Sequence, residues 1–298
     1  MMNNIANNFT KKFVTLATLV FLCSLPTTTL AKSSVWKVSK NNDHVYIGGT
    51  IHVLPEEHPM PSEFINAFNN TDQLILEAQL PDPNDAAAQQ AMIAKMSYTN
   101  GDNLQSKLTP ETFKLLTNYF TTIGSNVNQF TSFKPGFVIT IMALIELQKA
   151  QISGEGVDAF FEAQATIENK KIDYLETADM QFTMLSQLGE GYEDEFILAN
   201  LELNSSFTEF FGLILDAWQV GDSARLESLI NDAALDSDEK SYEALFSVRN
   251  KNWVPKIEAM FNNKHKELVL VGAGHLFGKD GLLALLKKQG YTIEQSSL

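Results

Sequence analysis

Two histidines and one glutamate stand where apolar runs of the sequence end. His52 closes a GxxH motif that begins at Gly49, and His275 closes a second GxxH motif that begins at Gly272, more than two hundred residues later. Glu77 ends a third apolar run in the same way. Two neutral imidazoles and one carboxylate are the ligand composition of catalytic metal sites that keep a position for water. The three residues therefore predict a His/His/Glu metal site.

The ligand types limit both the metal and its chemistry. The single cysteine, Cys23, falls in an N-terminal segment that we expect to be removed, so only His, Asp and Glu remain as ligands. Such a mixed N/O set suits a divalent ion such as Mn, Co, Zn or Fe, which would lower the pKa of bound water and polarise a carbonyl. Glu77 would then be a metal ligand or a general base, and the residues leave both roles open.

Each motif also has an ordinary structural alternative. A single histidine after a strand is usually a hydrogen-bonded loop residue, and four-residue motifs with two fixed positions are weak signals. Two copies in matching contexts, together with a glutamate at a strand end, strengthen the metal-site hypothesis. From the residues alone, the structural and the metal-binding interpretations stay open.

Strands must position these side chains, because loops at strand ends leave a crevice above a rigid sheet. The N-terminal pattern predicts a hairpin with a turn at 41–43, whose Asn and Asp residues favour turns. The pattern near the C-terminus, a strand followed by a helix and a strand, fits a βαβ or split βαβ unit. The predicted strands are 35–38, 44–50, 73–78, 171–175, 267–271 and 291–294.

The middle of the chain predicts helices instead. We expect an α/β (α+β) fold in which N- and C-terminal segments form a small mixed β-sheet core, with a large, mostly helical insertion at about 82–245. We also expect Pro255 to begin a new helical segment. The predicted helices include 62–69, 136–149, 192–220, 222–234, 242–261 and 279–289.

Residues 1–31 predict a secretory signal peptide. Lys11 and Lys12 precede the apolar stretch 13–25, and a small-residue cleavage site ends at Ala31. The stretch is too short to favour spanning a bilayer, so an uncleaved anchor is the weaker alternative. We therefore expect an exported protein, periplasmic or secreted, that consists of residues 32–298 and has no stable membrane insertion after cleavage.

The net charge of the chain limits the classes of partner that it can bind. The net charge is −14 at pH 7, and loss of the two lysines in 1–31 would make it more negative. A strongly acidic surface repels nucleic acid and anionic membranes, so we expect neither as a partner. Solubility alone is enough to explain the acidity.

Several segments together resemble the TraB/GumN family, which includes the Tiki metalloproteases. The likeness spans most of residues 32–298 and is weakest in the helical stretch 82–150. It is carried, in order, by 46–52 (Tyr-Ile-Gly-Gly-Thr-Ile-His), 74–77, 156–161, 175–181, Arg249-Asn250 and 271–275 (Val-Gly-Ala-Gly-His).

The resemblance implies a metal-dependent peptidase or related hydrolase acting on a peptide or protein substrate. In Tiki-like members the two GxxH histidines and a glutamate are the metal and catalytic residues, with Mn or Co as the ion. Carried over by motif, these residues are His52, His275 and Glu77. Other members have roles in which enzymatic activity is less secure, but this chain retains all three residues.

Four further residues are secondary candidates. Glu176 follows its strand as Glu77 does, so it is a second carboxylate for the site or simply a charge favoured at a helix start. Arg249 could hold a substrate carboxylate or an oxyanion, with a surface ion pair as the alternative. Asp158 and Gln181 match family positions and could orient the ligands.

Three function classes follow. The preferred hypothesis is an exported metal-dependent hydrolase, most simply a peptidase. The alternative is a non-enzymatic periplasmic protein that binds peptides or signals in the same cleft. A purely structural protein would have no cleft at the strand ends.

Overall fold

The computed structural model describes residues 33–82, 84–99 and 101–296. The predicted signal peptide, 1–31, lies outside these residues, so it stays a prediction. Within the described ranges, no helix combines the length and the apolar character needed to cross a bilayer.

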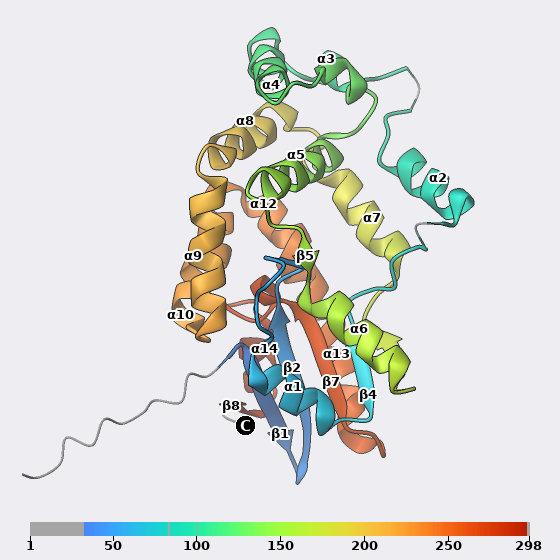
Figure 1. Cartoon of the computed structure of the whole chain (residues 1–298), viewed down its shortest axis with the longest axis vertical. Helices are drawn as coiled ribbons and strands as arrows, with labels where there is room; N and C mark the ends of the chain where they lie inside the picture. Colours follow the sequence, from blue (N-terminus) through green and yellow to red (C-terminus); the bar gives the residue numbers. More distant parts are fainter. Residues whose placement is uncertain (1–32, 83, 100, 297–298) are drawn as a thin grey trace, which may run out of the picture. The chain divides into compact units, whose positions relative to one another are not determined.

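A mixed sheet of six strands is the centre of the described chain (Figure 1). Its strands are β1 (Val35–Lys40), β2 (Asp43–Thr50), β4 (Gln73–Leu76), β6 (Lys171–Tyr174), β7 (Glu267–Gly272) and β8 (Thr292–Gln295). They lie in the order β6-β4-β7-β2-β1-β8, in which the first four run parallel. The predicted α/β fold with a mixed sheet is confirmed, and β6 adds a strand from within the predicted insertion to those from the two ends of the chain.

The predicted N-terminal hairpin is present and has the expected turn. Asn41 and Asn42 adopt positive φ angles of 52° and 67°, a conformation that asparagine tolerates better than most residues. Two successive residues of this kind make a turn whose twist matches paired strands. As a result Lys40 pairs directly with Asp43, and all of β1 runs antiparallel to residues 43–48 of β2.

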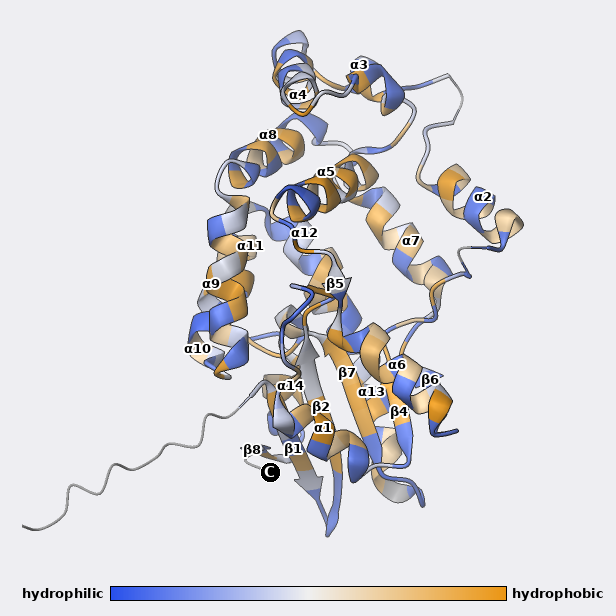
Figure 2. Ribbon diagram, viewed as in Figure 1, coloured by the Kyte–Doolittle hydropathy of each residue, from blue (hydrophilic) through white to orange (hydrophobic). Residues whose placement is uncertain are grey.

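Strand β7 is the most buried part of the sheet. Residues 268–271 have no exposed surface, and Figure 2 shows the strand as apolar along its length. A parallel strand with neighbours on both sides needs apolar residues on both faces, which explains the uninterrupted run. After β7 the chain forms α14 (Leu282–Lys288) and returns as β8, parallel to β7 but beyond β2 and β1. The predicted split βαβ unit is therefore present.

Helices cover the two faces of the sheet. In Figure 1, α1 (Ser62–Asn69) and α6 (Val157–Ile167) lie in front of the strands, and α13 (Val248–Glu258) and α14 lie behind them. On the front face Phe64 stacks on Phe161, with 6.2 Å between ring centroids. Both side chains are fully buried, so this contact packs the two helices against each other, and Phe64 also lies over Gly48 of β2.

Most of the remaining chain is helical and has a second apolar core, which includes Leu104, Phe120 and Met142. A two-residue pairing of β3 (Val53–Leu54) with β5 (Gly154–Glu155) connects this region to the residues after β2. The other helices are α2 (Ala86–Lys95), α3 (Leu104–Lys107), α4 (Pro110–Thr122), α5 (Pro135–Lys149), α7 (Ala178–Gln187), α8 (Glu193–Asn204), α9 (Phe207–Gln219), α10 (Ser223–Leu226), α11 (Ala233–Ser237) and α12 (Glu239–Tyr242), with short turns η1 (Val127–Gln129), η4 (Ala259–Asn262) and η5 (Ala273–His275).

Three helix boundaries differ from the prediction. The segment 192–220 divides at Ser205 and Ser206 into α8 and α9. The segment 222–234 contains a π-helical stretch, η2 (Glu227–Asp232), and a second one, η3 (Glu243–Ser247), precedes α13. Pro255 lies inside α13 and does not start a new segment. Ile257, two residues after this proline, is fully buried in the main core, and this packing offsets the hydrogen bond that proline cannot donate.

Candidate site at the strand ends

The register of β2 against β7 brings the two GxxH motifs together. Thr50 pairs with Gly272 at the last step of the parallel ladder. His52 follows Thr50 by two residues, and His275 follows Gly272 by three, so both histidines leave the sheet at the same edge. Side chains more than two hundred residues apart in the sequence thus share one end of the sheet.

Strands β4 and β6 bring two carboxylates to the same edge. Leu76 pairs with Tyr174, and the ladder continues past both strands because the N–H of Glu176 donates to the carbonyl of Glu77 at 2.8 Å. Since β4 also runs parallel to β7, Glu77 emerges beside the second GxxH motif. Four neighbouring parallel strands therefore deliver the predicted residues to one row.

Arg249 of α13 lies within this row of side chains. Its Nη2 is 2.5 Å from Oε2 of Glu77 and 2.6 Å from Oε1 of Glu176, and its Nη1 is 2.9 Å from Nε2 of His275. The arginine side chain is 11% exposed. A guanidinium can satisfy several acceptors at once, so this cation neutralises two carboxylates that would otherwise be buried unpaired.

The hydrogen bonds around His275 fix its tautomer. Nδ2 of Asn250 donates to the carbonyls of His275 and Asp280, at 3.2 and 2.9 Å, so Oδ1 of Asn250 is an acceptor. This oxygen lies 2.7 Å from Nδ1 of His275, which therefore carries the proton. Nε2 is then free to accept from Arg249. Burial lowers the pKa of His275 to about 3, so the ring is neutral at pH 7.

His52 is held from the other side by Asp158. Nδ1 of His52 is 2.8 Å from Oδ2 of Asp158, whose Oδ1 accepts from the hydroxyl of Thr50 at 2.9 Å. The Asp158 carboxylate raises the pKa of His52, although the imidazole is 64% exposed and water screens the pair. Gly156 lets the start of α6, which carries Asp158, approach the backbone of His52, because a Cβ at Gly156 would overlap the carbonyl oxygen of His52.

Glu77 is an ionised carboxylate despite its burial. Burial alone would raise its pKa, but His275, Arg249 and His52 face it, and the N–H of Gly272 donates to Oε1 at 2.7 Å. Together these groups lower the pKa of Glu77 to about 2. Gln181, the other predicted orienting residue, donates to Oε2 at 3.1 Å.

The imidazole nitrogens and the carboxylate oxygen around Gly272 are of the types that bind divalent metals. A Cβ on Gly272 would lie 3.2 Å from Nε2 of His52 and 3.4 Å from Oε1 of Glu77, which is itself 3.7 Å from Nε2 of His275. Both histidines have their Nδ1 fixed by a neighbouring side chain, as metal-bound histidines usually do. As the side chains stand, however, no three His, Cys, Asp or Glu residues of the described ranges are gathered closely enough to hold an ion. Metal binding to His275 would require Arg249 to leave Nε2.

Two pockets meet at His52 and Glu77, which line both of them. One, of about 390 Å³, also contains Arg249 and His275 and is otherwise mostly apolar. The other, of about 290 Å³, lies toward Asp158 and has polar and apolar lining residues. A substrate at the site would therefore meet different surroundings on its two sides.

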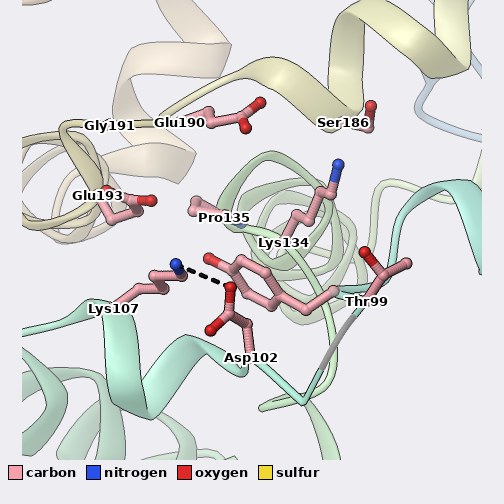
Figure 3. Close-up of a pocket in the computed structure, with 10 residues that line it drawn as sticks. Thr99, Asp102, Lys107, Lys134, Pro135, Ser186, Glu190, Gly191 and Glu193 are labelled. Atoms are coloured by element: carbon pink, nitrogen blue, oxygen red, sulfur yellow. Dashed lines mark ion pairs between the residues drawn. The ribbon is translucent and has the colours of Figure 1, made fainter.

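A further pocket, of about 360 Å³, lies in the helical region (Figure 3). Its lining carries both charges, and Lys107 forms an ion pair with Asp102 at 2.9 Å. It shares no lining residue with the two pockets at the strand ends. The pocket is thus separate from the candidate site.

Sequence reasoning gave no individual role to two residues of α13. Asn250 holds His275, as described above, and Trp253 packs against the same ring, with 4.4 Å between centroids. Nε1 of Trp253 also donates to Oε2 of Glu176 at 3.2 Å. The sequence feature that could have indicated a role for Trp253 is its spacing from Arg249: the two residues are four apart and so share a helix face.

The fold and the site define an α/β protein with paired GxxH motifs on adjacent parallel strands. A model of the TraB/PrgY/gumN family matches residues 34–295, nearly the whole chain. The chain belongs to this family, which confirms the resemblance seen in its motifs. No curated protein and no solved structure matches the chain.

Proposed function

We propose that this chain is an exported, metal-dependent hydrolase, most simply a peptidase acting on a peptide or protein substrate. The observation that supports it is the convergence of His52, Glu77 and His275 at the ends of adjacent parallel strands. Nε2 of His52 and Oε1 of Glu77 lie close to Gly272, where a side chain would crowd both atoms, and Nε2 of His275 is 3.7 Å from the same Oε1. Family membership is consistent with this proposal.

In this proposal His52 and His275 bind a divalent ion, Mn, Co or Zn, through Nε2. A bound ion of this kind supplies an activated water and polarises a carbonyl group. Glu77 is either the third ligand or the general base; its low pKa keeps the carboxylate ionised at neutral pH, which favours binding of a cation. Asp158 and Asn250 keep the two imidazoles oriented.

Arg249 has a second role in the proposal. Its guanidinium contacts Glu176 through Nε at 3.0 Å and Nη2 at 2.6 Å, independently of the bond to His275. When Nη1 leaves His275, the side chain thus remains tethered at the site. An N–H group released in this way can donate to the oxyanion that forms on a substrate carbonyl.

Elemental analysis tests the metal site directly. We expect the purified protein to retain a stoichiometric divalent ion, and His52→Ala and His275→Ala to abolish it while circular dichroism stays native. His265→Ala is the matched control, because His265 lies on the surface beside Asp72, 3.1 Å away. Full occupancy in the double variant His52→Ala/His275→Ala would end the metal-site hypothesis.

The second candidate is a peptide- or signal-binding protein without catalytic activity. It is favoured by Arg249, which already satisfies Glu77, Glu176 and His275 without any ion. Incubation of peptides with the protein and added Mn, Co or Zn separates the two candidates. Cleavage that is lost in Glu77→Gln supports the hydrolase, whereas tight binding with no cleavage under any metal supports the binding protein.

A further inference from the structure

We propose that the candidate site selects its substrate by one bulky apolar side chain, which enters the pocket of about 390 Å³ next to His275. This inference rests on the proposed function for its substrate class, a peptide, but the pocket can be tested whether or not the peptide is cut. Pockets of this volume with mostly apolar walls are typical of small-molecule and side-chain binding.

The walls of this pocket are apolar side chains that the fold leaves partly exposed. Phe211 and Ile214 come from α9, Ile230 from η2, and Leu245 and Phe246 from η3. None of them is fully buried in the core. Apolar surface that remains open to water next to polar groups marks a binding site for an apolar ligand group. The polar wall of the same pocket contains His52, Glu77, Arg249 and His275, so an occupant would be held directly beside them.

A second apolar pocket borders the first one. A second pocket, of about 260 Å³, shares Ile214, Ile230 and Leu245 with the first. Its other walls include Leu229, Ala233 and further apolar side chains of α5, α8 and α9. These three side chains border both spaces, so the apolar wall next to His275 belongs to a larger apolar region.

The second GxxH motif is built into this pocket. A Cβ on Gly274 would lie 2.6 Å from Cε1 of Phe246 and 2.9 Å from Cγ2 of Ile230, so the glycine lets both walls approach His275. Nδ2 of Asn231 donates to the carbonyl of Gly274 at 2.7 Å and ties η2 to the motif. Both π-helical segments thus present side chains at the site, a use for which π-bulges are known.

The other side of the site is chemically different. The pocket of about 290 Å³ has the carboxylates of Asp158 and Glu162 and the amide of Gln181 among its lining groups. We therefore expect the apolar preference at one substrate position only, on one side of the bond that is cut. A preference at one substrate position only would distinguish a selective pocket from a general affinity of the protein for apolar peptides.

A set of peptides that differ at one position tests the inference. With the metal-loaded protein, we expect kcat/KM to be at least about tenfold higher for Phe or Leu than for Gly or Asp at the selected position. Ile214→Trp, in the wall of the pocket of about 390 Å³, fills that pocket and should reverse the order of the Phe and Gly substrates. Ala94→Trp, an exposed position on α2, is the matched control and should leave the preference unchanged. Cleavage with no preference among these side chains would overturn the inference.

A binding arm separates this inference from the proposed function. In metal-free protein with chelator present, titration with the Phe peptide should shift the methyl NMR signals of Ile230 and Leu245, but not that of Leu115 on α4. The Asp peptide should shift neither. Binding of this kind without any cleavage would contradict the proposed hydrolase activity but would support the side-chain pocket. The inference would be refuted if these shifts are absent. It would also be refuted if they appear only when the fatty acid dodecanoate is added in place of the peptide.

Discussion

Nη1 of Arg249 lies 2.9 Å from Nε2 of His275, the nitrogen that the second GxxH motif presents to the site. Because Nδ1 of the ring already donates to Asn250, this nitrogen can accept a hydrogen bond or bind a metal, but not both. The arginine and a metal ion are thus alternative partners of one histidine. The buried carboxylates of Glu77 and Glu176 need a cation in either case.

Loss of the arginine charge should destabilise the fold. Arg249→Gln leaves Glu77 and Glu176, whose side chains are 10% and 2% exposed, without their cation. We expect the free energy of unfolding to fall by about 3–5 kcal/mol, measured by urea denaturation without metal. Arg225→Gln replaces the only other arginine, which is exposed, and should cost less than about 0.5 kcal/mol. Equal effects of the two substitutions would contradict the role of Arg249.

Although Arg249→Gln should lower stability, it should strengthen metal binding. Arg249→Gln removes both the positive charge and the donor that occupies Nε2 of His275. We expect the dissociation constant for Mn or Zn, measured by calorimetry, to fall relative to that of Arg225→Gln. A weaker or unchanged affinity would show that Arg249 and the metal do not compete.

The Asp158 carboxylate should be visible in the titration of His52. Asp158→Asn keeps an oxygen acceptor but removes the charge that raises the pKa of His52, so this pKa should fall toward its ordinary value near 6.5. Proton NMR of the imidazole measures it. A His52 pKa that stays unchanged would contradict the pairing.

The same pair predicts a pH-dependent stability difference. Because the pKa of His52 is higher in the folded protein, the pair contributes stability that is present below pH 6.5 and is lost as pH rises through the folded pKa. The difference in unfolding free energy between wild type and Asp158→Asn should thus be larger at pH 5 than at pH 10. The opposite order would be inconsistent with a raised pKa.

Asn250 should control the tautomer of His275. Asn250→Ala removes the acceptor at 2.7 Å and leaves a buried N–H without a partner, which costs about 1–3 kcal/mol. Nitrogen-15 NMR of the imidazole should report loss of the single Nδ1–H tautomer. Asn118→Ala, at an exposed position of α4, should change neither quantity. An unaltered His275 spectrum in Asn250→Ala would refute the assignment.

Export should be accompanied by loss of the N-terminal segment. In an exporting host we expect the mass of the mature protein to begin at Lys32, as the small-residue site ending at Ala31 predicts. Leu22→Arg interrupts the apolar stretch and should retain the full-length chain in the cytoplasm. A secreted protein that still contains residues 1–31 would contradict the prediction.

The strands and their end residues could be predicted because their signals are local. Apolar runs followed by Glu77, His52 and His275 indicate both the strands and the residues that leave them. Parallel pairing then places such residues at one edge, whatever their distance in sequence. The spatial proximity of the candidate residues was therefore accessible from the sequence, whereas their roles stay predictions.

The contacts of Arg249 and the details of the helices were not accessible. Which acceptors a guanidinium reaches depends on where α13 packs behind the sheet, and no local pattern encodes that position. The division of 192–220 at Ser205 and the course of α13 through Pro255 likewise follow from packing. The π-helical segments η2 and η3 also depend on tertiary contacts, since their side chains pack toward Gly274.

Strand β7 is the next-to-last strand along the chain, yet it lies between β2 and β4. A chain emerging from the ribosome or a translocation pore, N-terminus first, must therefore wait for residues 267–272 before its sheet can close. Until then β2 and β4 have no common neighbour, and His52 and Glu77 have no scaffold that joins them. Such late, long-range pairing is intrinsically slow. If the chain is exported, as we propose, the site is assembled only after residues 267–272 have crossed, so that its chemistry is confined to its destination.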